Sequence, residues 1–458
     1  MTRGRAVTLV LVAHVALDYA VALNLGFYGL APLLYAVIAG AVLLYVAAGA
    51  PAAGSDATPS ARVVACWLVA LALGGLVSRS LQFAAGGGLA QLVFGWNLLL
   101  LLGGGVLLFA SFGSVSRGAR WGRIVFGVIA VATLLRLLVP YASPEPRIDV
   151  FTMREEGAAA LLAGTNPYET PIRDPIPGGA EQYGYSVGNY AYMPATLLPD
   201  AVAFGLAGDV RVASVLAELL ACLCLVFVAR RRLPALWDSP AALLTAAPLL
   251  YSKGPFVVEM SWTEPLLLGA LAVWWALAAL DRERWAAAAF GLFLAFKQYL
   301  VFYALAFFGE ALGRGRVSRV WIPAVVVVAT ALPFLVWDVE SFLTYPVRWM
   351  VTENLPFRED ALSLAGLWFR ATGTAPPGFL AMVAGAITLA CLLARWWRRG
   401  PVFSGREDIV LVGTAATLVA FLVGPQAFAN YYYFLTNALA FVFVGAGLVA
   451  AERAPTEA

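Results

Sequence analysis

The sequence has little charge. Asp, Glu, Lys and Arg make up 12% of its 458 residues, whereas 62% are hydrophobic. This excludes an ordinary soluble domain, in which about 25% of residues are charged. The only histidine, His14, is far in sequence from the four cysteines, and their spacing matches no metal site. We therefore predict an all-α polytopic membrane protein whose cysteines are small buried apolar side chains.

Lysine is also nearly absent, since Lys253 and Lys297 are the two that occur and every other basic side chain is arginine. The arginines cluster at the ends of apolar runs. Placing all clusters in the cytoplasm predicts about fourteen transmembrane helices (about 12 to 14), each of about 20 residues, with both termini cytoplasmic. The spans are expected at 6–25, 28–50, 63–80, 91–112, 123–142, 212–229, 240–256, 262–280, 285–298, 299–313, 317–337, 376–396, 408–424 and 431–451.

One more apolar run, 193–206, contains two prolines and Asp200. Counting it as a span would place Arg230–Arg232 outside, so we interpret it as an interfacial or re-entrant helix. The predicted outer loops are 143–211, 257–261, 338–375 and 425–430. We expect the chain to divide into N-terminal transmembrane hairpins of unknown role, 1–112, and a second transmembrane region, 113–458.

The first outer loop opens with a polar segment, RIDVFTMREEGAAALLAGTNPY, at 147–168. Asp149 stands where the preceding span emerges. A carboxylate that is partly wetted but faces a low-dielectric cavity suits general-base chemistry. The alternative is a solvated aspartate paired with Arg147. The stretch after Asp149 has Arg154, Glu155 and Glu156 on one side, which is typical of an interfacial helix or of an ordinary connecting helix.

Lys297 lies within an apolar stretch, LFLAFKQYLVF. A lysine inside the membrane is costly and indicates a functional site, although a long side chain that reaches the interface is the alternative. If spans 285–298 and 299–313 meet at the outer face, Lys297 faces the same cavity as Asp149. A compact ammonium there suits a phosphate ligand.

Other outer-loop residues are candidates for the same cavity. Tyrosines stack on sugar rings but also form interfacial belts, and loop arginines bind phosphate but also occur as solvated charges. The candidates are Arg348 and Arg358 for phosphate; Tyr168 and Tyr192 for a sugar ring; Lys253, Glu259 and Glu264 for the cavity wall; and Gln426, Asn430 and Tyr431 for sugar hydroxyls.

Three features occur together: Asp149 at the end of a span, the turn Gly164–Tyr168 with a downstream Tyr192-Met-Pro194, and Lys297-Gln298 between short spans. This combination resembles the GT-C superfamily of multispanning glycosyltransferases. Within it, the chain is most similar to bacterial polyprenyl-phosphate-mannose-dependent mannosyltransferases. The segments LPFLVWDVESFLTYPVRW, PFREDALSL and NYYYF also resemble that branch, and the resemblance covers about residues 123–451.

The resemblance implies an inverting glycosyltransferase of the cell (inner) membrane with its active site on the outer face. A polyprenyl-phosphate-linked sugar, mannose or another hexose or pentose, is the implied donor, and a lipid or glycan is the acceptor. Asp149 takes the role of base, and Lys297, Arg348 and Arg358 are implied to hold the donor phosphate. Many members carry paired acidic residues and a metal here. This chain has a single carboxylate at that position, so we expect no metal. We also expect no cofactor and no nucleic-acid partner.

Three other functions remain open from the sequence. A transporter or lipid flippase would place ionisable residues at the bilayer midplane, whereas the polar residues here gather at one face. A membrane scaffold would not need that concentration of polar groups on one side. A glycan polymerase or ligase would differ in acceptor rather than mechanism.

Overall fold

The computed structural model describes residues 1–49, 58–77, 81–113, 120–173, 188–313, 315, 320–349, 357–403 and 405–448. Some predicted features fall partly outside these residues. They are the span ends at 50, 78–80, 317–319 and 449–451 and the loop segments 174–187 and 350–356.

The predicted all-α class is confirmed. The described residues form helices and one isolated β-bridge, between Phe27 and Ala361. Seven helices or helix runs are long and apolar enough to cross a membrane: Arg3–Ala22 (α1), Leu30–Ala48 (α2), Gly88–Ala110 (α4), Arg120–Ala142 (α5 and α6), Arg211–Arg232 (α10), Pro240–Glu259 and Phe379–Arg399 (α20). Shorter apolar helices are Ala61–Val77 (α3), Pro194–Ala207 (α9), Glu264–Ala279 (α14) and Trp321–Trp337 (α17).

The remaining helices complete the correspondence with the expected spans. They are Asp149–Leu162 (α7), Pro234–Trp237 (α11), Glu283–Leu294 (α15), Gln298–Leu300 (η2), Val301–Gly313 (α16), Val339–Leu343 (α18), Thr344–Trp349 (η4), Leu364–Thr372 (α19), Arg406–Val423 (α21) and Ala429–Gly445 (α22). Each predicted span coincides with a helix or a run of helices. The number that cross the membrane stays a prediction.

The run Pro240–Glu259 is broken into three pieces, Pro240–Ala246 (η1), Ala247–Leu250 (α12) and Gly254–Glu259 (α13). Each piece has a proline in its first turn, where the missing N–H is tolerated, and each proline interrupts the helix before it. The apolar window of this run is completely buried inside the bundle. Irregular backbone at membrane depth requires such burial, because lipid cannot satisfy its polar groups.

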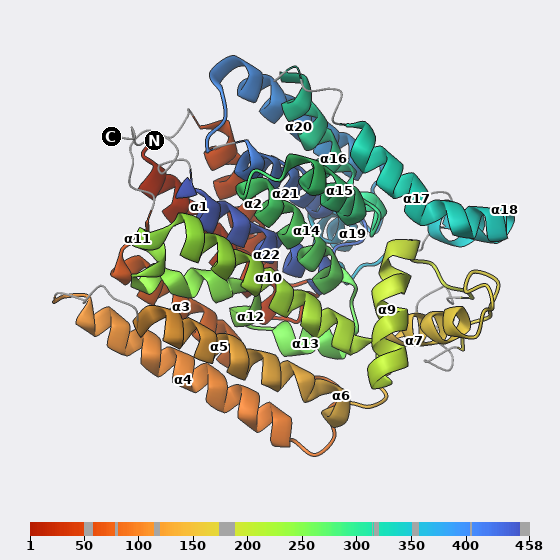
Figure 1. The fold of residues 1–458 in the computed structure, drawn as a ribbon, viewed down its shortest axis with the longest axis horizontal. Coiled ribbons are helices and arrows are strands. Elements are labelled where there is room, and N and C mark those ends of the chain that lie inside the picture. Colours follow the sequence, from red (N-terminus) through yellow and green to blue (C-terminus); the bar gives the residue numbers. More distant parts are fainter. Residues whose placement is uncertain are drawn as a thin grey trace.

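The N-terminal helices pack against the C-terminal ones. Helix α1 contacts α2, α3 and α22, and α2 contacts α21. Figure 1 shows the N-terminus at one end of the bundle and helices α7 and α9 at the opposite end. Helices α7 and α9 pack against each other, and α9 also contacts α10 and α17.

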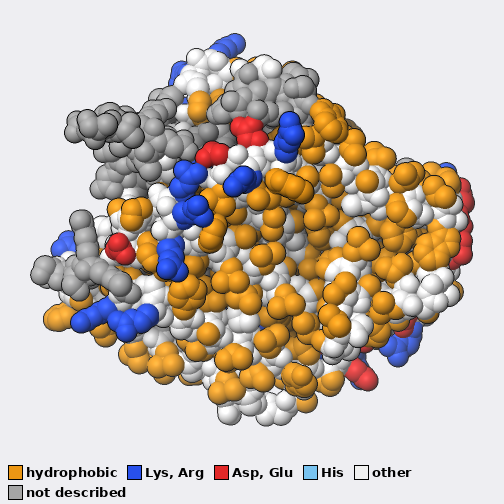
Figure 2. Space-filling model, in the orientation of Figure 1, with side chains coloured by type: hydrophobic (Ala, Val, Ile, Leu, Met, Phe, Trp, Pro, Cys, Tyr) orange, Lys and Arg blue, Asp and Glu red, His pale blue; other side chains and the backbone are white. Residues whose placement is uncertain are grey.

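The outer surface is largely apolar. Figure 2 shows a broad field of hydrophobic side chains, with the visible basic side chains gathered mostly toward the end that holds the N-terminus. Large side chains such as Phe109 and Leu206 are more than four-fifths exposed, as expected for a surface that faces lipid. The prediction of buried cysteines holds only for Cys222; Cys66 and Cys391 lie on outward helix faces and Cys224 is half-buried.

Candidate functional site

The predicted break at Lys297 is present. Helix α15 ends at Leu294, Lys297 has an extended backbone (φ −151°, ψ 145°), and η2 begins at Gln298. The Lys297 ammonium lies 2.6 Å from Oε1 of Glu264. It also lies over three tyrosine rings, at 5.2 Å from the ring centre of Tyr192, 5.6 Å from Tyr431 and 5.7 Å from Tyr299. Such aromatic faces attract a cation, so the Lys297 ammonium is held in place at the break between α15 and η2.

Glu264, in the first turn of α14, is the centre of this cluster. Its Oε1 accepts hydrogen bonds from Lys297 Nζ at 2.6 Å, from Asn430 Nδ2 at 3.0 Å and from Tyr299 OH at 3.4 Å. Its Oε2 is buried and has no hydrogen-bond partner among the described residues. A buried acceptor is costly unless it is satisfied, so Oε2 is suited to a hydroxyl donor.

Asp149 lies at the start of α7 and is half-buried. Its Oδ1 accepts the Val150 N–H at 2.8 Å, and a helix N-terminus favours a negative charge. Tyr192 lies within electrostatic range of both Asp149 and Glu264. Desolvation of the Tyr192 phenol, followed by the negative charges of Asp149 and Glu264, raises its pKa well above the usual value. The charges of both carboxylates therefore act on one phenol, whose ring also faces Lys297.

Helix α7 is anchored by Arg154, which is fully buried. Its guanidinium makes a bidentate pair with both oxygens of Asp200 in α9. It also donates to the Ser261 carbonyl at 2.6 Å and to Ser214 Oγ at 3.1 Å. The expectation that Arg154 lies with Glu155 and Glu156 on the polar side of the helix is wrong. Its five donors are instead used to fix the helix that begins with Asp149.

Two of the predicted contact residues are engaged in supporting the surrounding structure. Tyr168 is fully buried, packs edge-on against Tyr190, and donates from its hydroxyl to the Tyr192 carbonyl at 2.9 Å. Glu259 accepts hydrogen bonds from the backbone N–H groups of Gln82 and Phe83. It therefore ties the connection between α3 and α4 to α13.

The predicted phosphate-binding arginines are both ion-paired. Arg358 forms a two-bond pair with Asp360, at 2.7 and 2.8 Å, and lies over the ring of Phe428. Arg348 is exposed and pairs with the exposed Glu340 at 2.6 Å.

The structure brings the other candidates to the site to different degrees. Gln298, next to Lys297, donates to the Pro346 carbonyl, so the segment that carries Arg348 lies beside the break. Asn430 joins the Glu264 cluster directly and Tyr431 lies against Lys297, whereas Gln426 is half-buried in the turn before α22. Lys253 is fully buried within the bundle. Among the described residues, no three His, Cys, Asp or Glu side chains are grouped to hold a metal.

A third buried ionic group was not predicted from the sequence. Arg136 Nε lies 2.6 Å from Glu218 Oε2, and Tyr433 donates to Glu218 Oε1 at 2.6 Å. All three side chains are buried. Charged residues inside apolar spans are an available signal, because such charges are rare and paired. Arg136 and Glu218 both carry that signal.

Comparison with known proteins gives one structural similarity and no family. No family model matches the chain, and no curated protein matches it. Its fold is similar to the crystal structure of ArnT from Cupriavidus metallidurans bound to undecaprenyl phosphate, with 16% identity and a TM-score of 0.45. The match covers 71% of this chain and 60% of that chain, which is less than two thirds of the ArnT length.

Proposed function

We propose that the protein is an inverting glycosyltransferase that moves a sugar, mannose or another hexose or pentose, from polyprenyl phosphate to a lipid or glycan hydroxyl. The observation that carries this proposal is the grouping of Asp149, Tyr192, Glu264 and Lys297. An acid, a cation and aromatic faces are the groups that this reaction requires.

Each group has a role in one displacement. Asp149 accepts the proton of the acceptor hydroxyl, whose oxygen then attacks the anomeric carbon. The bond from that carbon to the phosphate oxygen breaks, and polyprenyl phosphate leaves with the electron pair. Lys297 stabilises the phosphate, because Glu264 uses only one of its three N–H donors. Attack opposite the leaving group inverts the anomeric centre.

Tyr192, Tyr431 and Asn430 would contact the sugar ring, and Glu264 Oε2 would accept one of its hydroxyl protons. Arg348 and Arg358 are further phosphate-binding candidates, and Gln426, Tyr168 and Glu259 contribute through the walls of the site. Residues 1–112 would form an auxiliary unit beside the catalytic region 113–458. We place the site on the outer face and both termini in the cytoplasm of a cell (inner) membrane, and propose that turnover needs no metal.

The competing function is a transporter or lipid flippase. The observation that favours it is the buried Arg136–Glu218 pair, since ionisable residues inside a bundle are typical of transporters. These charges compensate each other, and Tyr433 completes the hydrogen bonding of Glu218 Oε1. The pair therefore also fits a structural role, in which it stabilises the packing of the bundle.

The test is sugar transfer by the purified protein in lipid nanodiscs. A panel of labelled polyprenyl-phosphate sugars is offered with crude membrane-lipid acceptors. A labelled product that is lost in Asp149→Asn supports the proposal and names the donor sugar. Absence of transfer from every donor, together with absence of donor binding, would overturn it.

A further inference from the structure

We propose that the turn between α1 and α2, residues 24–29, positions the phosphate side of the active site, with Gly26 as its positioning residue. The inference rests on the proposed function and assigns a role to the N-terminal helices. The turn touches two segments that carry predicted phosphate ligands or their partners. These are the start of α22, which the turn contacts at Ala429, and the segment 357–363.

The first contact is a close backbone approach. Gly26 is buried with φ +78°, and a Cβ added to it would lie 2.5 Å from N, Cα and Cβ of Ala429. Only glycine fits at this distance, and the positive φ also favours glycine. Ala429 is followed in the chain by Asn430, whose Nδ2 donates to Glu264, the partner of Lys297. A shift at Gly26 is therefore transmitted to Lys297 through one residue and two polar contacts.

The second contact is a short backbone pairing. The Tyr28 N–H donates to the Asp360 carbonyl at 2.8 Å, and Phe27 forms the isolated β-bridge with Ala361. Asp360 is the residue whose carboxylate holds the guanidinium of Arg358. The pairing therefore fixes the backbone on which the Arg358 ion pair is built.

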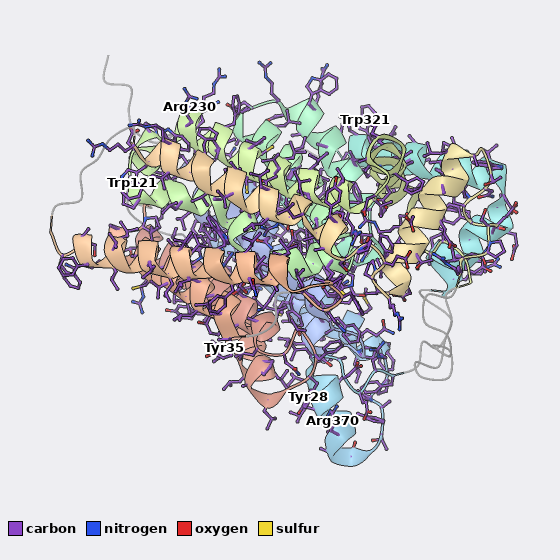
Figure 3. The ribbon with its side chains drawn as sticks, turned by 90° about the horizontal axis from the view of Figure 1, so that it is seen from below. Tyr28, Tyr35, Trp121, Arg230, Trp321 and Arg370 are labelled. Carbon is purple, nitrogen blue, oxygen red and sulfur yellow. The ribbon has the colours of Figure 1, made fainter. Side chains whose placement is uncertain are left out.

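Aromatic contacts complete the attachment. The rings of Phe27 and Phe428 pack edge-on, with their centres 6.4 Å apart. The guanidinium of Arg358 lies over the same Phe428 ring, 4.9 Å from its centre. Arg370 in α19 lies 4.6 Å over the ring of Tyr28, and Figure 3 shows these two side chains close together at the edge of the bundle. The turn is thus held from several directions, as positioning requires.

The segment 357–363 is joined to α22 as well. The Leu362 N–H donates to the Ala427 carbonyl at 2.8 Å, and the Tyr432 hydroxyl donates to the Leu362 carbonyl. The turn, this segment and the start of α22 therefore form one connected unit. Because displacements of about 1 Å in a reacting geometry cost about a hundredfold in rate, a small shift of this unit is expected to matter.

The test compares two glycine substitutions. Gly26→Ala meets Ala429, whereas Gly86→Ala has a similar positive φ, +77°, and no neighbouring atom within 4 Å. Both substitutions place an alanine at a similar positive φ and so carry a similar conformational penalty. The difference between the two variants therefore isolates the contact with Ala429. We expect Gly26→Ala to raise the donor KM about ten- to hundredfold over Gly86→Ala while the acceptor KM stays unchanged. It should weaken binding of polyprenyl phosphate alone by a similar factor.

A second set of three variants covers the case in which Gly26→Ala does not fold. Tyr28→Ala removes the ring under Arg370, and Tyr28→Phe keeps it. Phe112→Ala removes the ring under Arg62, a contact of similar geometry at 4.5 Å elsewhere in the N-terminal helices. We expect a raised donor KM in Tyr28→Ala, rescue in Tyr28→Phe and no change in Phe112→Ala.

The two proposals fail in different ways. If the wild-type protein transfers sugar and both alanine variants, Gly26→Ala and Tyr28→Ala, match their controls in donor KM and polyprenyl-phosphate binding, the positioning role is wrong and the function stands. Equal increases in donor KM and acceptor KM together with a loss of thermal stability would also overturn the positioning role, because they indicate general unfolding. If the wild-type protein neither binds nor uses any donor, the function fails and the inference falls with it.

Discussion

Two groups of carboxylates differ in how completely their oxygens are used. Both oxygens of Asp200 bind the guanidinium of Arg154, and both oxygens of Glu259 accept backbone N–H groups. In the candidate site, Glu264 has hydrogen-bond partners among the described residues only at Oε1, and Asp149 is half-buried at a helix start. Carboxylates with both oxygens engaged hold the bundle together, whereas Glu264 retains one oxygen that can accept a substrate hydroxyl.

The largest effect is expected at Asp149. Asp149→Asn removes the proposed base, so turnover should fall by about 10²- to 10⁴-fold while folding and membrane insertion are unchanged. Glu155→Gln is the matched control, because it neutralises another carboxylate of the same helix. The measurement is the transfer rate in nanodiscs. Retained activity in Asp149→Asn would remove Asp149 from the role of base.

At Asp200 we expect a loss of stability rather than a specific loss of turnover. Asp200→Asn leaves the buried Arg154 charge without a counter-charge, which costs about 3–5 kcal/mol of stability when one partner of a buried pair is removed. The comparison is Asp281→Asn, which breaks the exposed pair with Arg232 and should cost about 0–1 kcal/mol. Denaturant titration in detergent measures both. Equal stabilities would show that the Arg154 pair does not anchor α7.

Lys297 combines both features, since its ammonium is ion-paired with Glu264 and also faces the candidate site. Lys297→Ala should weaken donor use more than acceptor use, by about 1.5–3 kcal/mol for a lost charge-assisted hydrogen bond. It also leaves Glu264 buried without its cation. Combining it with Glu264→Gln removes that carboxylate charge, so the double variant should regain stability but not donor affinity. Steady-state kinetics with donor and acceptor varied in turn separate these effects, and equal losses for both substrates would contradict the phosphate role.

The smallest effect concerns Glu155, on the outer side of α7. Its burial, followed by the nearby charge of Asp209, raises its pKa. A raised pKa means that the folded protein binds this proton more tightly than the unfolded chain. Its contribution therefore favours folding below the usual glutamate pKa of about 4.3 and is lost as pH rises through the raised value. Glu155→Gln should flatten the dependence of melting temperature on pH over that window; an unchanged slope would contradict the assignment.

The sequence was sufficient for the positions of the helices, because apolar runs, prolines and terminal arginines are local signals. The break at Lys297 and the helix at 194–207 were predicted in this way. Pairs such as Arg154 with Asp200 were not, because the partners are 46 residues apart and meet only through the packing of α7 on α9. For the same reason the sequence did not connect Gly26 with Ala429.

The most direct test of the account follows two labels in one donor. Polyprenyl-phosphate sugar labelled in both the sugar and the lipid is incorporated with the purified protein and acceptor lipids in proteoliposomes. The proposed displacement predicts that the labels separate, with one free polyprenyl phosphate formed for each sugar transferred and with an inverted anomeric centre in the product. Labels that stay together while the donor redistributes across the bilayer would contradict glycosyl transfer and support a flippase.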